Sequence, residues 1–175
     1  MWQHHKLSVR DVTYAVDLGI ACLVTYWVAA FLLPHITGRP AAPVGILWAV
    51  ISAAFVYRDT RDRSWAAGVS RLIGTLVSLA LCLVYLYLFP ASAFAMAVLI
   101  VTGTLVMILL GRHDEIGLTA ITTAVVMIVA AGDPENARAQ PVLRLIDTAI
   151  GITIGVACKW TASFLFDRIA GKSSQ

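Results

Sequence analysis

Long apolar stretches follow one another along almost the whole sequence, with only short polar connections between them. A helix that crosses the hydrocarbon core of a bilayer needs about 20 mainly apolar residues at a rise of about 1.5 Å each. The second and fifth stretches are shorter than the others. We predict an all-α membrane protein with six transmembrane helices, at Val12–Leu33, Pro43–Tyr57, Trp65–Leu88, Ala91–Leu110, Ile116–Ala131 and Val142–Phe166.

The composition supports a membrane protein rather than a water-soluble domain. Of the 175 residues, 59% are hydrophobic and 13% are charged, whereas soluble domains have about 45–50% apolar and about 25% charged residues. A soluble fold of this size could not hide so much apolar surface. The formal net charge of +3 is too small for a nucleic-acid-binding domain, which carries clustered Lys and Arg. We expect membrane lipids, and not nucleic acid, as partners.

The connections between the predicted spans are too short to hold a folded domain. Helix-ending prolines follow the first, third and fifth spans, at Pro34, Pro90 and Pro134. Residues 1–11 are polar and no convincing cleavage site follows them, so we expect the first span to stay in the membrane. The sequence therefore predicts a single transmembrane domain over residues 1–175.

The positive charges are distributed unequally between the two sides of this topology. Cytoplasmic loops of membrane proteins carry an excess of Lys and Arg. If the N-terminus is cytoplasmic, only Arg39 and Arg138 lie outside. We therefore predict that both termini are cytoplasmic, together with eight basic residues, Lys6, Arg10, Arg58, Arg61, Arg63, Arg112, Arg168 and Lys172.

The sequence contains an internal repeat at an offset of 73 residues. Residues 70–75 (SRLIGT) align with residues 143–148 (LRLIDT), with four of six positions identical. The repeat unit has three helices, about residues 10–90 and about residues 91–168. Because three is odd, the second unit enters the membrane from the opposite side, which makes the two repeats inverted. The alternative is chance similarity between apolar helices.

Each repeat places an arginine inside a predicted span. An arginine at a helix centre costs about 2.5–3.5 kcal/mol on insertion scales, so such residues usually face the bundle interior, pair, or line an aqueous pathway. Arg71 lies well within the third span, and Arg144 lies nearer the start of the sixth. The alternative for both arginines is extension to the lipid headgroups. Asp147 and Thr148 share a helical face with Arg144, so Arg144 and Asp147 could also neutralise each other.

Two acidic residues within the spans could couple transport to protons. Asp17 interrupts the first span, and Asp147 interrupts the sixth. A lone carboxyl in a low-dielectric setting needs either a partner or a proton. Both are therefore candidates for proton coupling.

Small residues and cysteines are expected to serve packing. Gly74, Gly151 and Gly155 would let the third and sixth spans, or two subunits, approach closely. Cys22, Cys82 and Cys158 are isolated in apolar stretches and are expected to act as small core residues. No hydrolase, kinase, nucleotide-binding or metal-ligand motif occurs. We therefore expect no catalytic residues, no metal and no cofactor.

The arginine segments resemble those of a known family. The segment RLIGT at residues 71–75, which follows the charged connection Arg58–Arg63, resembles the fusaric-acid-resistance-like family of bacterial inner-membrane proteins. The segment RLIDTAIG at residues 144–151 strengthens the likeness, which covers nearly the whole chain. That superfamily includes aromatic acid exporters and is similar to plant aluminium-activated malate channels. Many relatives have a cytoplasmic domain or a duplicated membrane half, so the size of this chain implies a homodimer or higher homo-oligomer.

The resemblance implies a bacterial inner-membrane exporter or channel for small organic carboxylate anions, including aromatic ones. It assigns the attraction of the anion to Arg71 and Arg144, with Thr75 and Thr148 as their polar neighbours. The alternative is a non-transporting membrane subunit that scaffolds a partner protein or binds lipid.

Overall fold

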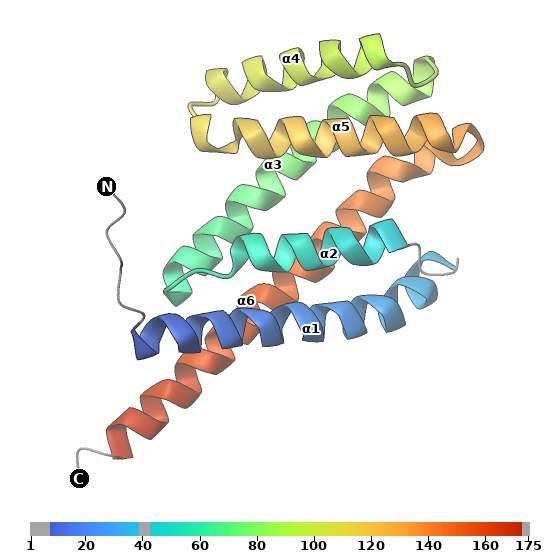
Figure 1. Cartoon of the computed structure of the whole chain (residues 1–175). Helices are drawn as coiled ribbons and strands as arrows, with labels where there is room; N and C mark the ends of the chain where they lie inside the picture. The colour runs from blue at the N-terminus through green and yellow to red at the C-terminus, as the bar shows by residue number, and fades with distance from the viewer. Residues whose placement is uncertain (1–7, 39–42, 173–175) are drawn as a thin grey trace, which may run out of the picture.

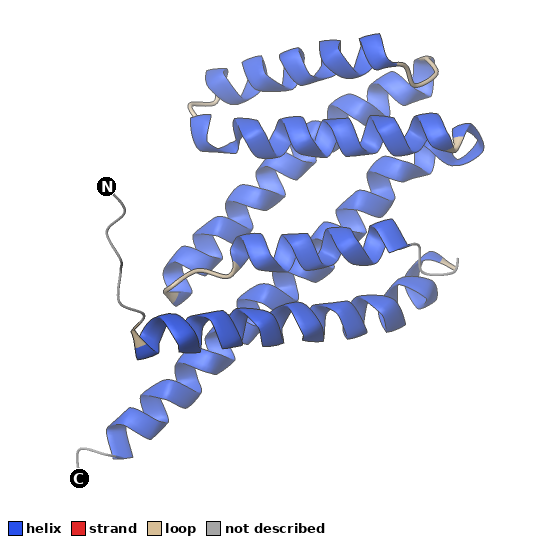
Figure 2. Cartoon of the chain, viewed as in Figure 1, coloured by secondary structure: helices blue, strands red, loops and turns tan. Residues whose placement is uncertain are grey.

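The computed structural model describes residues 8–38 and 43–172, and this part of the chain contains helices and no strand (Figure 2). The prediction of an all-α fold is confirmed, and each predicted span coincides with one helix. The α-helices are α1 (Val9–Thr37), α2 (Pro43–Val56), α3 (Arg61–Leu88), α4 (Ala93–Leu109), α5 (Ile116–Gly132) and α6 (Gln140–Lys172), with short 3₁₀ helices η1 (His113–Glu115) and η2 (Pro134–Ala139).

Helices α1, α3 and α6 extend beyond the predicted spans. α1 continues through Pro34 to Thr37, so the prediction that Pro34 ends this helix is wrong. α3 already begins at Arg61, because the hydroxyl of Thr60 accepts a hydrogen bond from the backbone N–H of Arg63 at 3.3 Å and caps the helix. α6 continues to Lys172. Hydrophobicity detects only the part of a helix that lies in lipid, so it misses turns that continue into water.

Four helical segments of the described chain are long and apolar enough to cross a membrane. They lie in α1, in α3, in the continuous η1–α5 segment and in the continuous η2–α6 segment. α2 and α4 have 14 and 17 residues, which corresponds to about 21 and about 26 Å of helix. That α2 and α4 each cross the membrane therefore stays a prediction.

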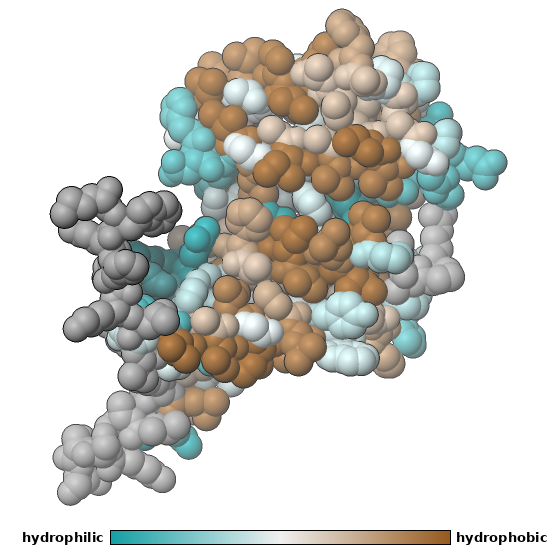
Figure 3. All heavy atoms as spheres, in the orientation of Figure 1, coloured by the Kyte–Doolittle hydropathy of each residue, from teal (hydrophilic) through white to brown (hydrophobic). Residues whose placement is uncertain are grey.

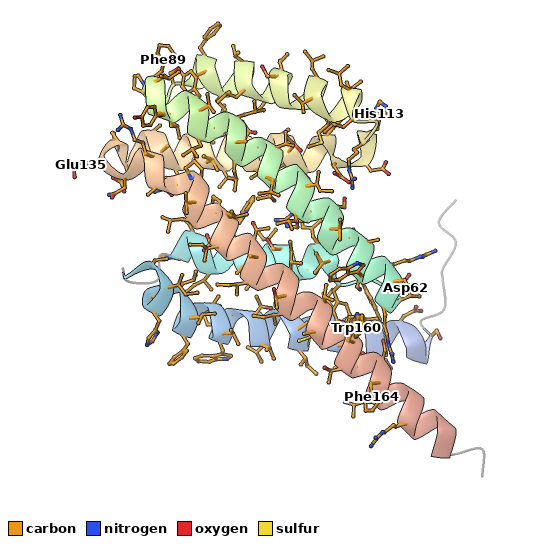
Figure 4. The ribbon with its side chains drawn as sticks, turned by 180° about the vertical axis from the view of Figure 1, so that it is seen from behind. Asp62, Phe89, His113, Glu135, Trp160 and Phe164 are labelled. Carbon is orange, nitrogen blue, oxygen red and sulfur yellow. The ribbon has the colours of Figure 1, made fainter. Side chains whose placement is uncertain are left out.

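The helices form two pairs that are joined by a third, oblique pair (Figure 1). α1 lies beside α2, α4 lies beside α5, and the long helices α3 and α6 lie side by side across both pairs. The opposite view shows α3 and α6 in front of the other helices (Figure 4). The oblique pair thus holds the other two pairs together.

The packing partners of the α1–α2 pair and of the α4–α5 pair correspond to each other. α1 and α2 both contact α6, while α4 and α5 both contact α3. In addition, α2 contacts α3 and α5 contacts α6. Each of these two pairs therefore packs mainly on the oblique helix from the other half of the chain.

Successive connections lie at alternating ends of the molecule. In Figure 4, Asp62 at the start of α3 and His113 in η1 lie at one end, whereas Phe89 after α3 and Glu135 in η2 lie at the other. Figure 1 also places the start of α1 and the last turns of α6 at the same end. We call the end with Asp62 and His113 the basic end, because four arginines lie there, in the connections or in the first turn of α3: Arg58, Arg61, Arg63 and Arg112.

Glycines allow α2 and α6 to approach closely. A Cβ added at Gly151 would collide with the backbone carbonyl oxygen of Ala49. A Cβ added at Gly155 would lie 2.9 Å from the carbonyl oxygen of Ala53. The prediction that these glycines pack against the third span is wrong, because α2 occupies this face of α6.

Other small residues serve the remaining contacts of α3. A Cβ at Gly68 would lie 3.1 Å from Cγ2 of Ile152, so Gly68 is a contact point between α3 and α6. A Cβ at Gly74 would lie 3.3 Å from the hydroxyl of Thr119, so Gly74 faces α5 and not α6. The glycine positions were thus correctly predicted to serve packing, but with the wrong partner helices.

An apolar cluster joins the α4–α5 pair to α3. Cys82 belongs to this cluster and is fully buried, as predicted. Cys22 and Cys158 are only partly buried. The other buried members are Leu79, Leu86, Ala95, Leu99, Val126, Met127 and Ala130.

The surface of the molecule is apolar. Large hydrophobic side chains are exposed on every α-helix; Phe94 is 81% and Leu109 is 86% exposed. Apolar surface covers much of α1, α2 and α5 in the view of Figure 3. Water-soluble monomers rarely expose such continuous apolar surface. Together with the long apolar helices, this surface identifies a multi-pass membrane protein.

Candidate functional site

Polar side chains are buried where the oblique helices meet α2 and α5. Two of them are arginines, Arg71 at 2% and Arg144 at 3% exposure. Ionisable groups inside a membrane domain are costly, and they commonly mark pathways for ions or substrates. The other buried polar residues of this region are Ser52, Thr75, Ser78, Thr119, Thr122, Thr123, Asp147 and Thr148.

Arg71 projects from α3 toward α2. Its Nε donates a hydrogen bond to the hydroxyl of Ser52 at 3.0 Å. Its guanidinium carbon lies 5.4 Å from the ring centroid of Trp48 and 4.8 Å from that of Phe55. Two aromatic rings of one helix thus flank the charge, and the guanidinium does not extend to the surface of the protein.

The terminal nitrogens of Arg71 have no partner. Both Nη atoms are buried and make no hydrogen bond within the described part of the chain. No ion pair to Arg71 is formed there either. Because a buried charge normally has a counter-charge or hydrogen-bond partners, this guanidinium has unused capacity to bind an anion.

Arg144 has a different environment, because it is paired. Its Nη1 lies 2.9 Å from Oδ2 of Asp147 and donates a hydrogen bond to the backbone carbonyl of Val44 at 3.1 Å. Both side chains of the pair are almost fully buried. Nε of Arg144 has no partner among the described residues. The structure therefore shows the self-neutralised arrangement rather than an arginine extended toward headgroups.

The two threonines of the repeat motif are buried beside these arginines. Thr148 accepts a hydrogen bond from Nε1 of Trp48 at 3.0 Å. The hydroxyl of Thr75, one turn after Arg71, is buried without a hydrogen-bond partner in the described structure. Thr75 therefore offers a second unused polar group on the same helix as Arg71.

Within the described residues, Asp17 forms no ion pair with either arginine. It is half-buried on α1, close enough to Tyr57 to interact electrostatically with its hydroxyl. Lys159 is in the same region, with its ammonium group 5.2 Å from the ring centroid of Tyr57. Of the two proton-coupling candidates, only Asp147 contacts a predicted anion-binding residue.

Sequence reasoning missed the contribution of α2. Trp48, Ser52 and Phe55 surround Arg71, but none of them was predicted as a site residue. They are spaced by four and three residues, so they share one face of a helix. This shared face could have indicated a site on α2, because it places a hydroxyl between two aromatic rings in an otherwise aliphatic span.

A second polar cluster ties the connection before α5 to α3. Glu115 is buried and accepts hydrogen bonds from Nε and Nη2 of Arg112 and from the hydroxyl of Ser70, the last at 2.6 Å. The hydrogen bonds from Arg112 to Glu115 raise the pKa of that guanidinium above its ordinary value. This cluster fixes η1 on α3 at Ser70.

A surface cavity of about 320 Å³ lies at the opposite end of the molecule from the basic end. Its lining includes Tyr87, Phe89 and Arg138, and the guanidinium carbon of Arg138 lies 5.2 Å from the ring centroid of Tyr87. The cavity begins at Leu86, about 22 Å along α3 from Arg71. It is therefore separate from the Arg71 site.

The chain was compared with curated proteins, with solved structures and with protein families. No curated protein and no solved structure matches the chain. The profile of a family described as fusaric acid resistance protein-like matches residues 18–158, well over half of the sequence. The matched segment includes both arginines and their threonines, and the family indicates a membrane transporter or exporter rather than an enzyme. The chain belongs to the fusaric acid resistance protein-like family.

Proposed function

We propose that this protein is a transporter or channel for small organic anions, aromatic carboxylates among them, and that Arg71 binds the anion. The observation that carries the proposal is the buried guanidinium of Arg71, whose two terminal nitrogens have no protein partner. Removing a charge from water is costly unless a counter-charge and hydrogen bonds compensate. A carboxylate can supply both, through the two parallel N–H···O bonds that a guanidinium favours.

The surroundings of Arg71 suit a carboxylate attached to a flat ring. Trp48 and Phe55 place aromatic rings within 5.4 Å of the guanidinium carbon. Aromatic groups prefer offset-stacked or edge-to-face contact with other rings. The buried hydroxyl of Thr75 supplies a further polar contact for the anion.

Arg144 is proposed as a second, conditional anion site. Its pairing with Asp147 leaves no net charge at this point. Protonation of Asp147 would break the ion pair and leave the guanidinium free to attract an anion, with Thr148 nearby. Asp147 is therefore the stronger candidate for coupling to protons, and Asp17 is the other candidate.

The proposed architecture has six crossing helices in two inverted repeats, with both termini in the cytoplasm of a bacterial cell. The alternation of connections between the two ends supports six crossings. The corresponding packing of α1–α2 on α6 and of α4–α5 on α3 supports the repeat. The positive-inside tendency supports a cytoplasmic basic end. A homodimer or higher homo-oligomer in the inner membrane completes the proposal.

Anion flux in proteoliposomes tests the role of Arg71. The full chain is reconstituted, and efflux of benzoate is compared with efflux of acetate for wild type, Arg71→Ala, Arg71→Lys and Arg144→Ala. Loss of a charge-assisted interaction predicts that Arg71→Ala lowers benzoate flux by about 10–100-fold. Lys keeps the charge but not the planar fork, so Arg71→Lys should retain part of the flux.

Arg63→Ala is the matched control, because Arg63 is an exposed arginine on the same helix. Its flux should equal that of wild type. Equal flux in Arg71→Ala and wild type would overturn the proposal, and the absence of flux in wild type would favour the non-transporting membrane subunit instead.

A further inference from the structure

We infer that the indole of Trp48 is a partition within the pathway, between the anion site at Arg71 and a second polar group formed by Arg144, Asp147 and Thr148. This inference rests on the proposed transport function, and it adds the residue that keeps the two polar groups separate.

Helix α2 gives the order of these groups across the molecule, because it contacts both. Ser52 accepts a hydrogen bond from Nε of Arg71, and the backbone carbonyl of Val44 accepts one from Nη1 of Arg144. Ser52 and Val44 are two turns apart, or about 12 Å along the helix axis. Trp48 is midway between them, so its indole lies where an anion would pass from one group to the other.

The indole is held from both sides. One contact is the approach of the Arg71 guanidinium to the indole ring, at 5.4 Å from its centroid. The other is the hydrogen bond from Nε1 to the hydroxyl of Thr148 on α6 at 3.0 Å. Trp48 is 4% exposed, so it fills the space between α3 and α6 rather than lining an open surface.

A filled apolar constriction blocks anions, because it offers nothing that replaces their hydration. Passage therefore requires rotation of the indole, which breaks the hydrogen bond to Thr148. An anion on Arg71 would neutralise the charge that attracts the ring face, so occupancy weakens one of the two contacts that hold Trp48. The partition thus opens more easily when substrate is bound than when Arg71 is free.

Leakage of a small inorganic anion tests the partition separately from substrate transport. Proteoliposomes that contain the full chain are assayed for nitrate permeability without organic substrate. Trp48→Ala should raise nitrate permeability well above the wild-type level. Thr148→Val, which keeps size but removes the hydrogen bond, should raise it about fivefold, the factor expected for one neutral hydrogen bond.

Two further variants make the result specific. Trp65→Ala removes an exposed tryptophan of α3, and it should leave the nitrate permeability at the wild-type level. Arg71→Ala in the Trp48→Ala background should reduce the leak again, because the leaking anion passes the same guanidinium. If Trp48→Ala does not yield folded protein, Thr148→Val alone carries the test.

The outcomes separate this inference from the proposed function. Benzoate flux that does not depend on Arg71 would overturn the proposed function. Benzoate flux that depends on Arg71, together with wild-type nitrate permeability in Trp48→Ala and Thr148→Val, would overturn the partition alone. Equal nitrate permeability in Trp48→Ala and in the double variant with Arg71→Ala would also overturn the partition, since the anion would then cross the protein without passing Arg71.

Discussion

Arg71 donates one hydrogen bond, from Nε to the hydroxyl of Ser52 at 3.0 Å, while both of its terminal nitrogens stay unpartnered in the described part of the chain. Ser52 therefore sets the direction of the guanidinium without neutralising it. Arg144, the corresponding arginine of the second repeat motif, is instead compensated by Asp147. The two arginines differ in what they can still bind.

Ser52→Ala should weaken anion binding without abolishing transport. The guanidinium loses the hydrogen bond that orients it, so we expect the half-saturating benzoate concentration to rise about fivefold, equivalent to about 1 kcal/mol. The measurement is concentration-dependent flux in proteoliposomes. Ser78→Ala is the matched control, because Ser78 is a buried serine of α3 that bonds Thr123 at 2.9 Å and not Arg71. An equal rise in both variants would contradict the positioning role.

The Arg144–Asp147 pair should show strong coupling in a double-mutant cycle. Removing one member of a buried pair leaves an uncompensated charge and typically costs about 3–5 kcal/mol. We therefore expect Arg144→Met and Asp147→Leu each to lower the thermal stability in detergent sharply, and the double variant to recover most of the loss. Additive losses would show that the pair is not coupled.

The same double variant also reports on transport. If Arg144 becomes an anion site when Asp147 is protonated, the double variant should fold but lose the dependence of benzoate flux on the proton gradient. Retention of this dependence would remove Asp147 as the coupling group and leave Asp17 as the candidate.

Gly151→Ala should force α2 and α6 apart. The added Cβ would collide with the carbonyl oxygen of Ala49, and overpacking of this kind costs about 1–3 kcal/mol. Thermal unfolding in detergent measures the loss. Gly19→Ala is the control, because a Cβ at Gly19 meets no atom within 4 Å and alanine favours a helix by about 0.5–1 kcal/mol. Equal stability in the two variants would contradict the close α2–α6 contact.

Single cysteines at the two ends of the molecule should be labelled from opposite sides of the membrane. In a background without Cys22, Cys82 and Cys158, we expect a membrane-impermeant thiol reagent to label Asp59→Cys from the cytoplasmic side and Glu135→Cys from the outer side. Six crossings require opposite sides for these positions, because α3, α4 and α5 lie between them. Labelling of both from one side would overturn the six-span topology.

The sequence predicted the helices well, because the hydrophobicity of a segment depends only on its own residues and can be followed along the chain. Its predicted second span, Pro43–Tyr57, differs from α2 by one residue at the end. It could not predict that Trp48 and Ser52 surround Arg71, because that contact joins two different helices. Their common face on α2 was visible in the sequence, but the helix that it faces was not.

The glycine motif shows the same limit. The spacing of Gly151 and Gly155 correctly indicated close helix packing. The partner is α2 and not α3, because any helix with small residues at matching positions satisfies the same motif. The likeness to plant malate channels likewise stays a prediction.

By itself, the sequence determined the fold class, the positions of the helices, the family and the presence of two arginines in long apolar helices, since hydrophobicity and short motifs are carried by neighbouring residues. Only the tertiary structure decided which contacts Arg71 makes. Arg144 finds Asp147 on its own helix, and it also bonds Val44, which is 100 residues away in the sequence. Arg71 reaches α2 at Ser52, which accepts only one of its hydrogen bonds. The Arg144–Asp147 pair follows from an i, i+3 spacing that the sequence already shows. The single hydrogen bond of Arg71 depends on how α2 packs against α3, which is a contact between segments that are distant in the sequence.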